Sequence, residues 1–166
     1  MRDLTTFCAT SDIKPVLTKV YVYEENDRKF AVATDAFRLV EWEIENDFLK
    51  KNITPGFYTA SKWKNMCKAY NKKNKDIRSF IEARDENILI NKNFVEDFPN
   101  YKQIIPTDTK ELIGNFSVNM EYFIDFIKMM PQLKFKELNF NKIKQNDKML
   151  YYEDYELKII LMNLKK

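Results

Sequence analysis

The chain has 166 residues, 45% of them hydrophobic and 14% aromatic, which is enough apolar material to bury the core of one ordinary domain. Its 28 basic and 25 acidic residues leave a formal net charge of only +3, so any contact with nucleic acid depends on local clusters of charge. It has no histidine and only two glycines, which excludes Ser-His-Asp and Cys-His nucleophiles, His-ligated metals, Walker loops and dinucleotide fingerprints. We therefore expect no enzymatic activity, no metal and no cofactor.

The two cysteines, Cys8 and Cys67, suit neither a disulfide framework nor a zinc cluster. Both are expected to be reduced, buried side chains of a cytosolic protein. No apolar run approaches the length that spans a bilayer, and the N-terminus carries no signal peptide. The sequence therefore predicts a cytoplasmic protein that makes no membrane contact.

The first part of the chain is predicted to be a set of strands. A short helix is expected through Leu4, Phe7 and Cys8, and Pro15 then breaks the chain. Alternation with a period of two predicts strands at 18–23, 30–34 and 37–44, with a turn at 24–29. A looser connection is expected at 45–55.

A second unit begins with a short predicted strand at 57–59 and continues into a helix with Ser61 as its N-cap. The helix carries an apolar stripe at the i, i+3, i+4, i+7 spacing, which predicts that this side lies in the core. The stripe consists of Trp63, Met66, Cys67 and Tyr70. Further strands are predicted at 77–83, 88–91 and 94–95.

A third unit has a predicted strand at 116–118 and a helix that ends before Pro131. Met120, Phe123, Ile124 and Ile127 form the apolar stripe of this helix, and Phe123, Ile124 and Ile127 are assigned to the core. The last predicted strands are 135–140, 149–152 and 157–164.

The order of a strand, a helix and two or three antiparallel strands thus occurs twice in full and once with its first strand weak or absent. Each unit is about 50–55 residues long, and the repeat is one of pattern alone. Burying the apolar sides of these elements favours an α+β fold with helices on one face of antiparallel sheets.

Three short segments resemble, in the same order, parts of one known family. They are Ala33-Thr34-Asp35-Ala36-Phe37-Arg38-Leu39, Phe98-Pro99-Asn100-Tyr101-Lys102-Gln103-Ile104-Ile105-Pro106 and Ile160-Leu161-Met162-Asn163-Leu164-Lys165-Lys166. They resemble the bacterial sliding clamp, the beta subunit of DNA polymerase III, and its phage relatives. The middle domain of that family carries an Ala-Thr-Asp-Gly-His-Arg-Leu turn and ends at Phe-Pro-Asp-Tyr, and its chain terminates in Met-Pro-Met-Arg-Leu.

The resemblance covers nearly the whole chain but only part of the family protein. Residues 1–106 resemble the middle clamp domain without its first strand, and residues 107–166 resemble the second half of the last domain. The segment 116–123 matches the start of that domain's helix. The resemblance implies a cut-down, DNA-clamp-like protein of three half-domain units, from a phage or mobile element. Because family rings contain about a dozen such units, a closed ring calls for a homo-oligomer of about four chains.

The resemblance also implies a hydrophobic pocket that binds short peptides of replication proteins, with apolar anchors in a slot and a few polar groups at its edge. The corresponding positions are Lys14, Leu17, Thr34, Ala36, Phe37, Arg38, Leu39, Pro99, Gln103, Ile104, Ile160, Leu161, Met162, Asn163 and Leu164. The chain departs from the family at Phe37 for a usual His, Asn163 for Pro, Leu164 for Met and Lys166 for a terminal Leu. These departures bear on which peptides fit.

A cluster of lysines without an intervening acid is the second candidate site. It consists of Lys62, Lys64, Lys68, Lys72, Lys73 and Lys75. In the family the helices face DNA, so the resemblance implies that these lysines hold the phosphate backbone without reading bases. An ordinary solvated helix face is the alternative.

We therefore predict a sliding-clamp-like processivity factor. It would hold double-stranded DNA non-specifically and bind a DNA polymerase, other proteins with clamp-binding motifs and a clamp loader. One alternative is an adaptor or decoy that forms no ring and captures clamp-binding peptides. A second is an unrelated α+β protein that binds single-stranded nucleic acid through 62–75 and nearby aromatic rings.

Overall fold

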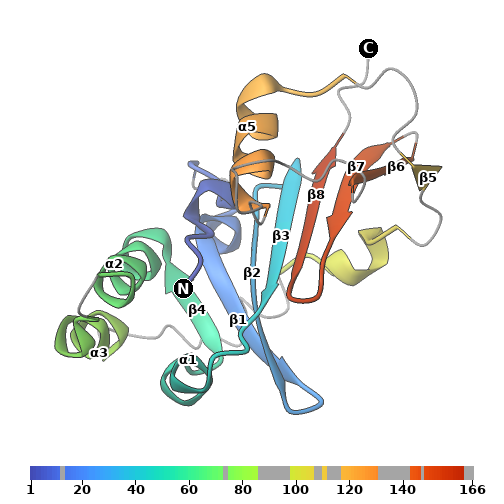
Figure 1. Cartoon of the computed structure of the whole chain (residues 1–166). Coiled ribbons are helices and arrows are strands. Elements are labelled where there is room, and N and C mark those ends of the chain that lie inside the picture. Colours follow the sequence, from blue (N-terminus) through green and yellow to red (C-terminus); the bar gives the residue numbers. More distant parts are fainter. Residues whose placement is uncertain are drawn as a thin grey trace.

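The computed structural model describes residues 1–11, 14–72, 75–85, 98–106, 110–111, 117–130, 143–146 and 148–162. In this part of the chain the strands form one antiparallel sheet of eight strands, in the order β4-β1-β2-β3-β8-β7-β6-β5 (Figure 1). The strands are β1 (Lys19–Glu25), β2 (Arg28–Thr34), β3 (Arg38–Glu43), β4 (Gly56–Thr59), β5 (Lys110–Glu111), β6 (Ile143–Asn146), β7 (Met149–Glu153) and β8 (Leu157–Met162). The helices are α1 (Asp47–Asn52), α2 (Ala60–Tyr70), α3 (Ile77–Asp85) and α5 (Met120–Met129), with short 3-10 helices η1 (Thr5–Phe7), η2 (Pro15–Thr18) and η3 (Tyr101–Ile104).

The fold class is the predicted one, an antiparallel sheet with its α-helices on one face (Figure 1). The strands predicted at 18–23, 30–34, 37–44, 57–59, 149–152 and 157–164 are confirmed with small shifts of their ends. Asn26 and Asp27 join β1 to β2, and both have positive φ, at 51° and 60°. A two-residue loop with positive φ at both positions matches the right-handed twist of the paired strands, which favours this hairpin.

The prediction of a strand at 77–83 is wrong, because these residues belong to α3. Asp76 starts this helix: its carboxylate accepts hydrogen bonds from the Ser79 backbone N–H at 3.0 Å and from the Ser79 hydroxyl at 2.8 Å. Phe80 is fully buried on the side of α3 that packs against α2. The N-cap at Asp76 was the sequence signal for this helix.

Other differences concern the starts of elements. Helix α1 lies in the stretch predicted as a loose connection, and Asn46 caps it by accepting a hydrogen bond from the Leu49 N–H at 3.3 Å. Helix α2 is capped by Thr59 and not by Ser61, since the Thr59 hydroxyl accepts from the Lys62 N–H at 3.3 Å. Strands β5 and β6 were not predicted. The strands predicted at 88–91, 94–95 and 135–140 lie outside the described residues, and the described part of 116–118 is not in a strand.

Alternation of side chains along the strands divides the core into two layers, one on each face of the sheet. The helical face is covered by α2 and α5, with α3 packed on α2, and its buried strand residues are Val20, Val22, Ala31, Ala33, Val40, Trp42, Leu150, Tyr152, Ile159 and Leu161. The second face carries Tyr21, Tyr23, Val32, Leu39, Phe57, Met149, Tyr151 and Ile160. The segment 98–106, which contains η3, packs on this second face, opposite the helices (Figure 1).

The apolar stripe of α2 is buried as predicted, but that of α5 is placed differently. Ile124 is 44% exposed, so its assignment to the core is wrong. The buried residues of this region are Phe126, Met129 and Met130, with Phe123 and Ile127 packed beside them. Phe123, Phe126, Ile127 and Met130 also follow the i, i+3, i+4, i+7 spacing, which puts Ile124 at the edge of the buried side.

Cys8 and Cys67 are free and buried, as predicted. Burial raises the pKa of both thiols to about 12, which makes them poor nucleophiles at neutral pH. In the described part of the chain, none of the helices combines the length and the apolar character needed to cross a bilayer.

The α2–α3 layer generates a first prediction. Phe80→Ala removes a fully buried ring that packs against Phe48 and Tyr70, so we expect the free energy of unfolding to fall by about 3–5 kcal/mol. Ile77→Ala, at an exposed position of the same helix, serves as the control and should cost much less. Urea unfolding of both variants measures the difference, and equal losses would contradict this packing of α3.

Candidate functional site

The candidate site lies where the first part of the chain meets its last strand. Strand β3 pairs antiparallel with β8, with Leu39 opposite Ile160 and Arg38 opposite Leu161. The pairing continues past β3, because the Met162 N–H donates to the Phe37 carbonyl at 2.8 Å. Two of the three segments that resemble the sliding clamp therefore lie side by side.

The third segment, 98–106, joins them on the second face of the sheet. Leu17, Leu39 and Ile160 belong to one buried cluster with Phe98 and Tyr101 of this segment. Met162 packs at the margin of the cluster. Of the predicted pocket residues, Leu17, Leu39 and Ile160 thus share one apolar cluster, with Met162 at its margin. We use the name second-face groove for the peptide site that the sequence predicts over this cluster, and define it as Leu17, Leu39, Pro99, Gln103, Ile104, Ile160 and Met162.

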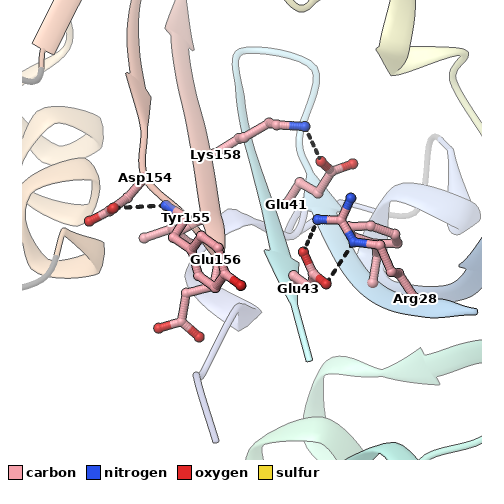
Figure 2. A pocket seen from close by; sticks show the side chains of 9 residues that line it. Arg28, Glu41, Glu43, Asp154, Tyr155, Glu156 and Lys158 are labelled. Atoms are coloured by element: carbon pink, nitrogen blue, oxygen red, sulfur yellow. Dashed lines mark hydrogen bonds and ion pairs between the residues drawn. The ribbon is translucent and has the colours of Figure 1, made fainter. Parts of the chain in front are cut away.

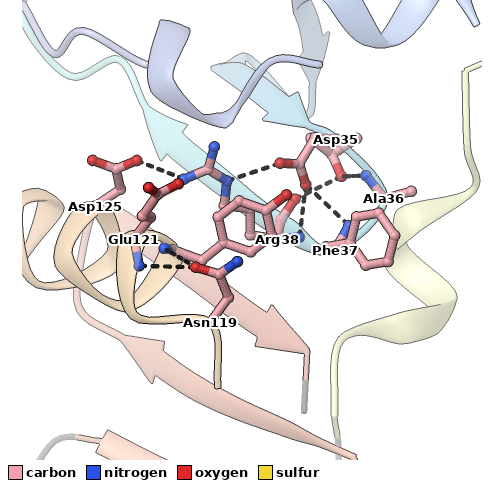
Figure 3. A network of polar contacts seen from close by, with 9 residues as sticks. Asp35, Ala36, Phe37, Arg38, Asn119, Glu121 and Asp125 are labelled. Atoms are coloured by element: carbon pink, nitrogen blue, oxygen red, sulfur yellow. Dashed lines mark hydrogen bonds and ion pairs between the residues drawn. The ribbon is translucent and has the colours of Figure 1, made fainter. Parts of the chain in front are cut away.

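Two of the predicted pocket residues point to the other side of the sheet. Leu161 alternates with Ile160 and is buried in the helical-face core. Arg38 alternates with Leu39, and its guanidinium donates to Asp35 at 2.9 Å and to Asp125 of α5 at 2.6 Å (Figure 3). Neither side chain lines the second-face groove; Arg38 ties the β2–β3 turn to α5.

The β2–β3 turn is held by its own side chains (Figure 3). The Asp35 carboxylate accepts hydrogen bonds from the backbone N–H groups of Phe37 and Arg38, both at 3.0 Å. The Thr34 hydroxyl donates to the Arg38 carbonyl at 2.7 Å and accepts from the Ala36 N–H at 3.1 Å. Ala36 has a φ of 77°, a conformation that favours glycine, so these bonds hold a strained turn.

The result of this turn is a large exposed ring next to the paired ends of β3 and β8. Phe37 is 59% exposed and lies 6.4 Å from the Tyr122 ring of α5, centroid to centroid. Ile104, at the end of η3, is 45% exposed. Lys14 is exposed beside η2, whereas Asn163 and Leu164 lie outside the described residues.

A buried carboxylate occupies the centre of the second face. Glu41 of β3 accepts hydrogen bonds from the hydroxyls of Tyr101 at 2.5 Å and Tyr23 at 2.9 Å, and from the Lys158 ammonium at 2.9 Å. Burial alone would raise the pKa of Glu41, but the bonds from Tyr101 and Lys158 outweigh it and leave the pKa below its usual value. Burial is also the main cause of the raised pKa of Tyr101. Glu41 is therefore ionised and its partners are neutral hydroxyls and one cation.

A second ion pair lies two residues further along β3. Glu43 accepts hydrogen bonds from two guanidinium nitrogens of Arg28, Nε and Nη2, and this hydrogen bonding lowers the pKa of Glu43 (Figure 2). The cavity beside it, between this pair and the β7–β8 turn, has a volume of about 30 Å³. That volume holds about one water molecule, so we assign this polar pair a structural role.

An aromatic cavity of about 300 Å³ adjoins the second-face groove. It is lined by Tyr21, Tyr23, Phe98, Pro99, Asn100, Tyr101 and Lys102. Lys102 closes one side, with its ammonium 2.5 Å from Glu25 and 5.1 Å from the centroid of the Tyr23 ring.

The lysine cluster is only partly assembled on one surface. Lys64 and Lys68 are exposed along α2, as their four-residue spacing predicts, and Lys72 is exposed two residues beyond the end of the helix. Lys62 is 7% exposed and its ammonium lies 5.8 Å from the centroid of the Tyr58 ring, so it is not part of this row. Lys75 stacks on Tyr70, and Lys73 lies outside the described residues.

The surface around this row is mixed in charge. Lys68 and Lys72 border a cleft of about 380 Å³ between α2 and α3, which is also lined by Asn65, Ala69, Ser79, Glu82 and Ala83. Lys72 pairs with Asp76 at 2.8 Å, and this bond is the main cause of the lowered pKa of Asp76. Within the described residues, no group of three or more acids or cysteines is arranged to hold a metal ion.

The Glu41 network was not predicted from the sequence, although the sequence carries a signal for it. In the run Val40-Glu41-Trp42-Glu43 a charge occurs at every second residue of a strand, which marks one face as polar. The partners, Tyr23, Tyr101 and Lys158, are distant in the chain, so only the register of the sheet identifies them.

A second prediction concerns Glu41 and pH. A carboxylate whose pKa is lower in the folded than in the unfolded state adds stability above the unfolded pKa, near 4.5, and loses it as the pH falls through the folded pKa. Glu41→Gln should therefore cost about 1–3 kcal/mol at pH 7 and clearly less at pH 3, measured by urea unfolding. Glu45→Gln, at an exposed carboxylate, should show no such difference. A loss from Glu41→Gln that is the same at both pH values would contradict the ionised network.

Comparisons with known proteins give limited results. No protein-family model matches the chain, and no curated protein matches it significantly. Solved structures of sliding clamps do align with it, among them the DNA polymerase sliding clamp of Bacillus subtilis, with 10% identity and a TM-score of 0.32. The beta subunits of Streptococcus pyogenes and Thermotoga maritima align with 11% and 9% identity and TM-scores of 0.29 and 0.30.

These alignments cover 99% of this chain but only 26–27% of each clamp, so the chain spans about a quarter of their length. TM-scores this low do not establish a common fold over the aligned residues. The function proposed for this chain therefore depends on the geometry of its own residues.

Proposed function

We propose that this chain is a sliding-clamp-like binding protein that tethers replication proteins through the second-face groove and holds duplex DNA through α2. The observation that carries the proposal is the meeting of three distant segments at Leu39 and Ile160. These are the segments in which the sequence resembles the peptide pocket of sliding clamps. The proposed role is non-catalytic.

The groove has the composition that short peptide motifs require. Leu39 and Ile160 supply a buried apolar floor, and Ile104 supplies exposed apolar surface for leucine and phenylalanine anchors. Gln103 is exposed and offers an amide that can bond the peptide backbone. Such an arrangement binds a peptide by a few buried anchors and fixes its direction by polar groups.

The proposed DNA contact is electrostatic. Lys64 and Lys68 lie four residues apart on the exposed side of α2, and Lys72 follows at the same interval just beyond the end of the helix. Mobile ammonium groups in such a row bind phosphates without base contacts, which permits sliding and gives a strong dependence on salt.

An adaptor that forms no ring is the second candidate, and α5 favours it. Its exposed side carries Met120, 68% exposed, and Ile124, together with the acidic Glu121 and a single lysine, Lys128. A helix that faced DNA as α2 is proposed to do would repel phosphate at Glu121 and bury apolar groups against it. Under this candidate the groove binds peptides while the chain remains a monomer.

A third prediction tests the groove. Ile104→Asp places a charge on exposed apolar surface without disturbing the core, so the protein should fold and bind a fluorescent clamp-binding peptide at least about tenfold more weakly. Ile77→Asp is the matched control, an isoleucine of similar exposure on α3. Fluorescence anisotropy measures the peptide affinity of both variants, and equal affinities would contradict the assignment of the groove.

A fourth prediction tests the DNA contact. Replacing Lys64, Lys68 and Lys72 together with glutamate should weaken duplex binding and lower the slope of log K against log salt by about one for each phosphate that is no longer neutralised. The control replaces three scattered exposed lysines, Lys51, Lys128 and Lys144, and so changes the net charge equally. If both triple variants bind alike, the α2 row is ordinary surface.

Light scattering over a concentration series separates the two candidates. An assembly of about four chains supports a ring, by the count of half-domain units. A monomer that still binds the peptide supports the adaptor.

A further inference from the structure

The segment 98–106 carries one wall of the second-face groove, yet its backbone does not join the sheet. Both backbone hydrogen bonds found in this segment among the described residues are internal, from Tyr101 N–H to the Pro99 carbonyl at 2.7 Å and from Gln103 N–H to the Asn100 carbonyl at 3.2 Å. Its position over the second face therefore depends on side chains.

Tyr101 joins this segment to the sheet by hydrogen bonding. Its hydroxyl lies 2.5 Å from the Glu41 carboxylate and 2.6 Å from the Tyr23 hydroxyl, and its ring is buried against Phe98. Hydrogen bonds to a charged acceptor are shorter and stronger than those between neutral groups. The segment also forms an ion pair between Lys102 and Glu25 of β1, but both of those side chains are about half exposed, whereas the bond from Tyr101 to Glu41 is buried.

Glu41 is itself fixed by the strand pairing that forms the groove. Lys158 of β8 is directly opposite Glu41 of β3 in the register, and their side chains form an ion pair at 2.9 Å. Leu39 precedes Glu41 by two residues and therefore lies on the same face of the same strand. One strand pair thus holds both the floor of the groove and the anchor of its wall.

We propose that Glu41 is a positioning residue for the groove: by binding the Tyr101 hydroxyl, it sets the distance between the 98–106 wall and the floor at Leu39 and Ile160. This inference rests on the proposed function of the groove. Lys158 keeps the carboxylate charged, and the charge is what lets one small side chain hold two tyrosine hydroxyls. Loosening the anchor leaves the apolar surface intact but lets the wall move.

The test uses Tyr101→Phe, which removes the hydroxyl and keeps the ring, in the full chain. Hydrogen–deuterium exchange should become about tenfold faster or more in 98–106 and not in the sheet, as expected for loss of a bond to a charged group. Binding of the fluorescent clamp-binding peptide should weaken by a similar factor. In the Glu41→Gln background, Tyr101→Phe should have little further effect on either quantity, because the bond that it removes is already weakened.

Glu43→Gln is the matched control. It lies on the same strand and the same face as Glu41 and gives up a comparable ion pair, to Arg28, but it does not touch 98–106. It should leave both the exchange of 98–106 and the peptide affinity unchanged.

The possible results test separately the anchoring role of Glu41, its positioning role and the proposed function of the groove. Unchanged exchange in 98–106 after Tyr101→Phe, or faster exchange throughout the sheet, overturns the anchoring role. Faster exchange confined to 98–106 with unchanged peptide affinity overturns the positioning role. A wild-type chain that binds no peptide overturns the proposed function of the groove, while the exchange rates still decide whether Glu41 anchors the segment.

Discussion

Strands β3 and β8 meet through antiparallel backbone hydrogen bonds, although they lie more than a hundred residues apart in the chain. That pairing joins the β1–β4 side of the sheet to the β5–β7 side, because β3 and β8 are neighbours at its centre. It also places Leu39 beside Ile160 and Glu41 beside Lys158. The groove floor, the buried ion pair and the continuity of the sheet all depend on this one register.

The two faces of the sheet are stabilised by different kinds of interaction. The helical face is filled by the apolar sides of α2 and α5, and its one prominent charge near the turn, Arg38, is matched by Asp35 and Asp125. Among the described residues, the second face is covered by the segment 98–106 and by Val16 and Leu17 of η2, and it combines aromatic packing with a buried carboxylate. Directional bonds to Glu41 supply the fixed geometry that helix packing supplies on the other face.

Periodicity predicted much of this from the sequence, where the pattern is local. The β1–β3 meander, the buried stripe of α2 and the α+β class follow from alternation and from helical spacing. The cap at Asp76 is equally local, but the sequence analysis predicted a strand at 77–83. The burial of Lys62 and the outward position of Ile124 depend on how each helix is rotated against the sheet, which no local pattern states. Glu41 needed partners from three distant places, and only tertiary structure supplies these.

The central claim is that the convergence of the three segments makes a peptide-binding groove. Its most direct test is an NMR titration of the isotopically labelled chain with a clamp-binding peptide that carries leucine and phenylalanine anchors. The account predicts amide shift changes that cluster in 37–39, 99–105 and 160–162, on the second face of the sheet. Shift changes confined to α2 and α3, or the absence of changes at saturating peptide, would contradict it.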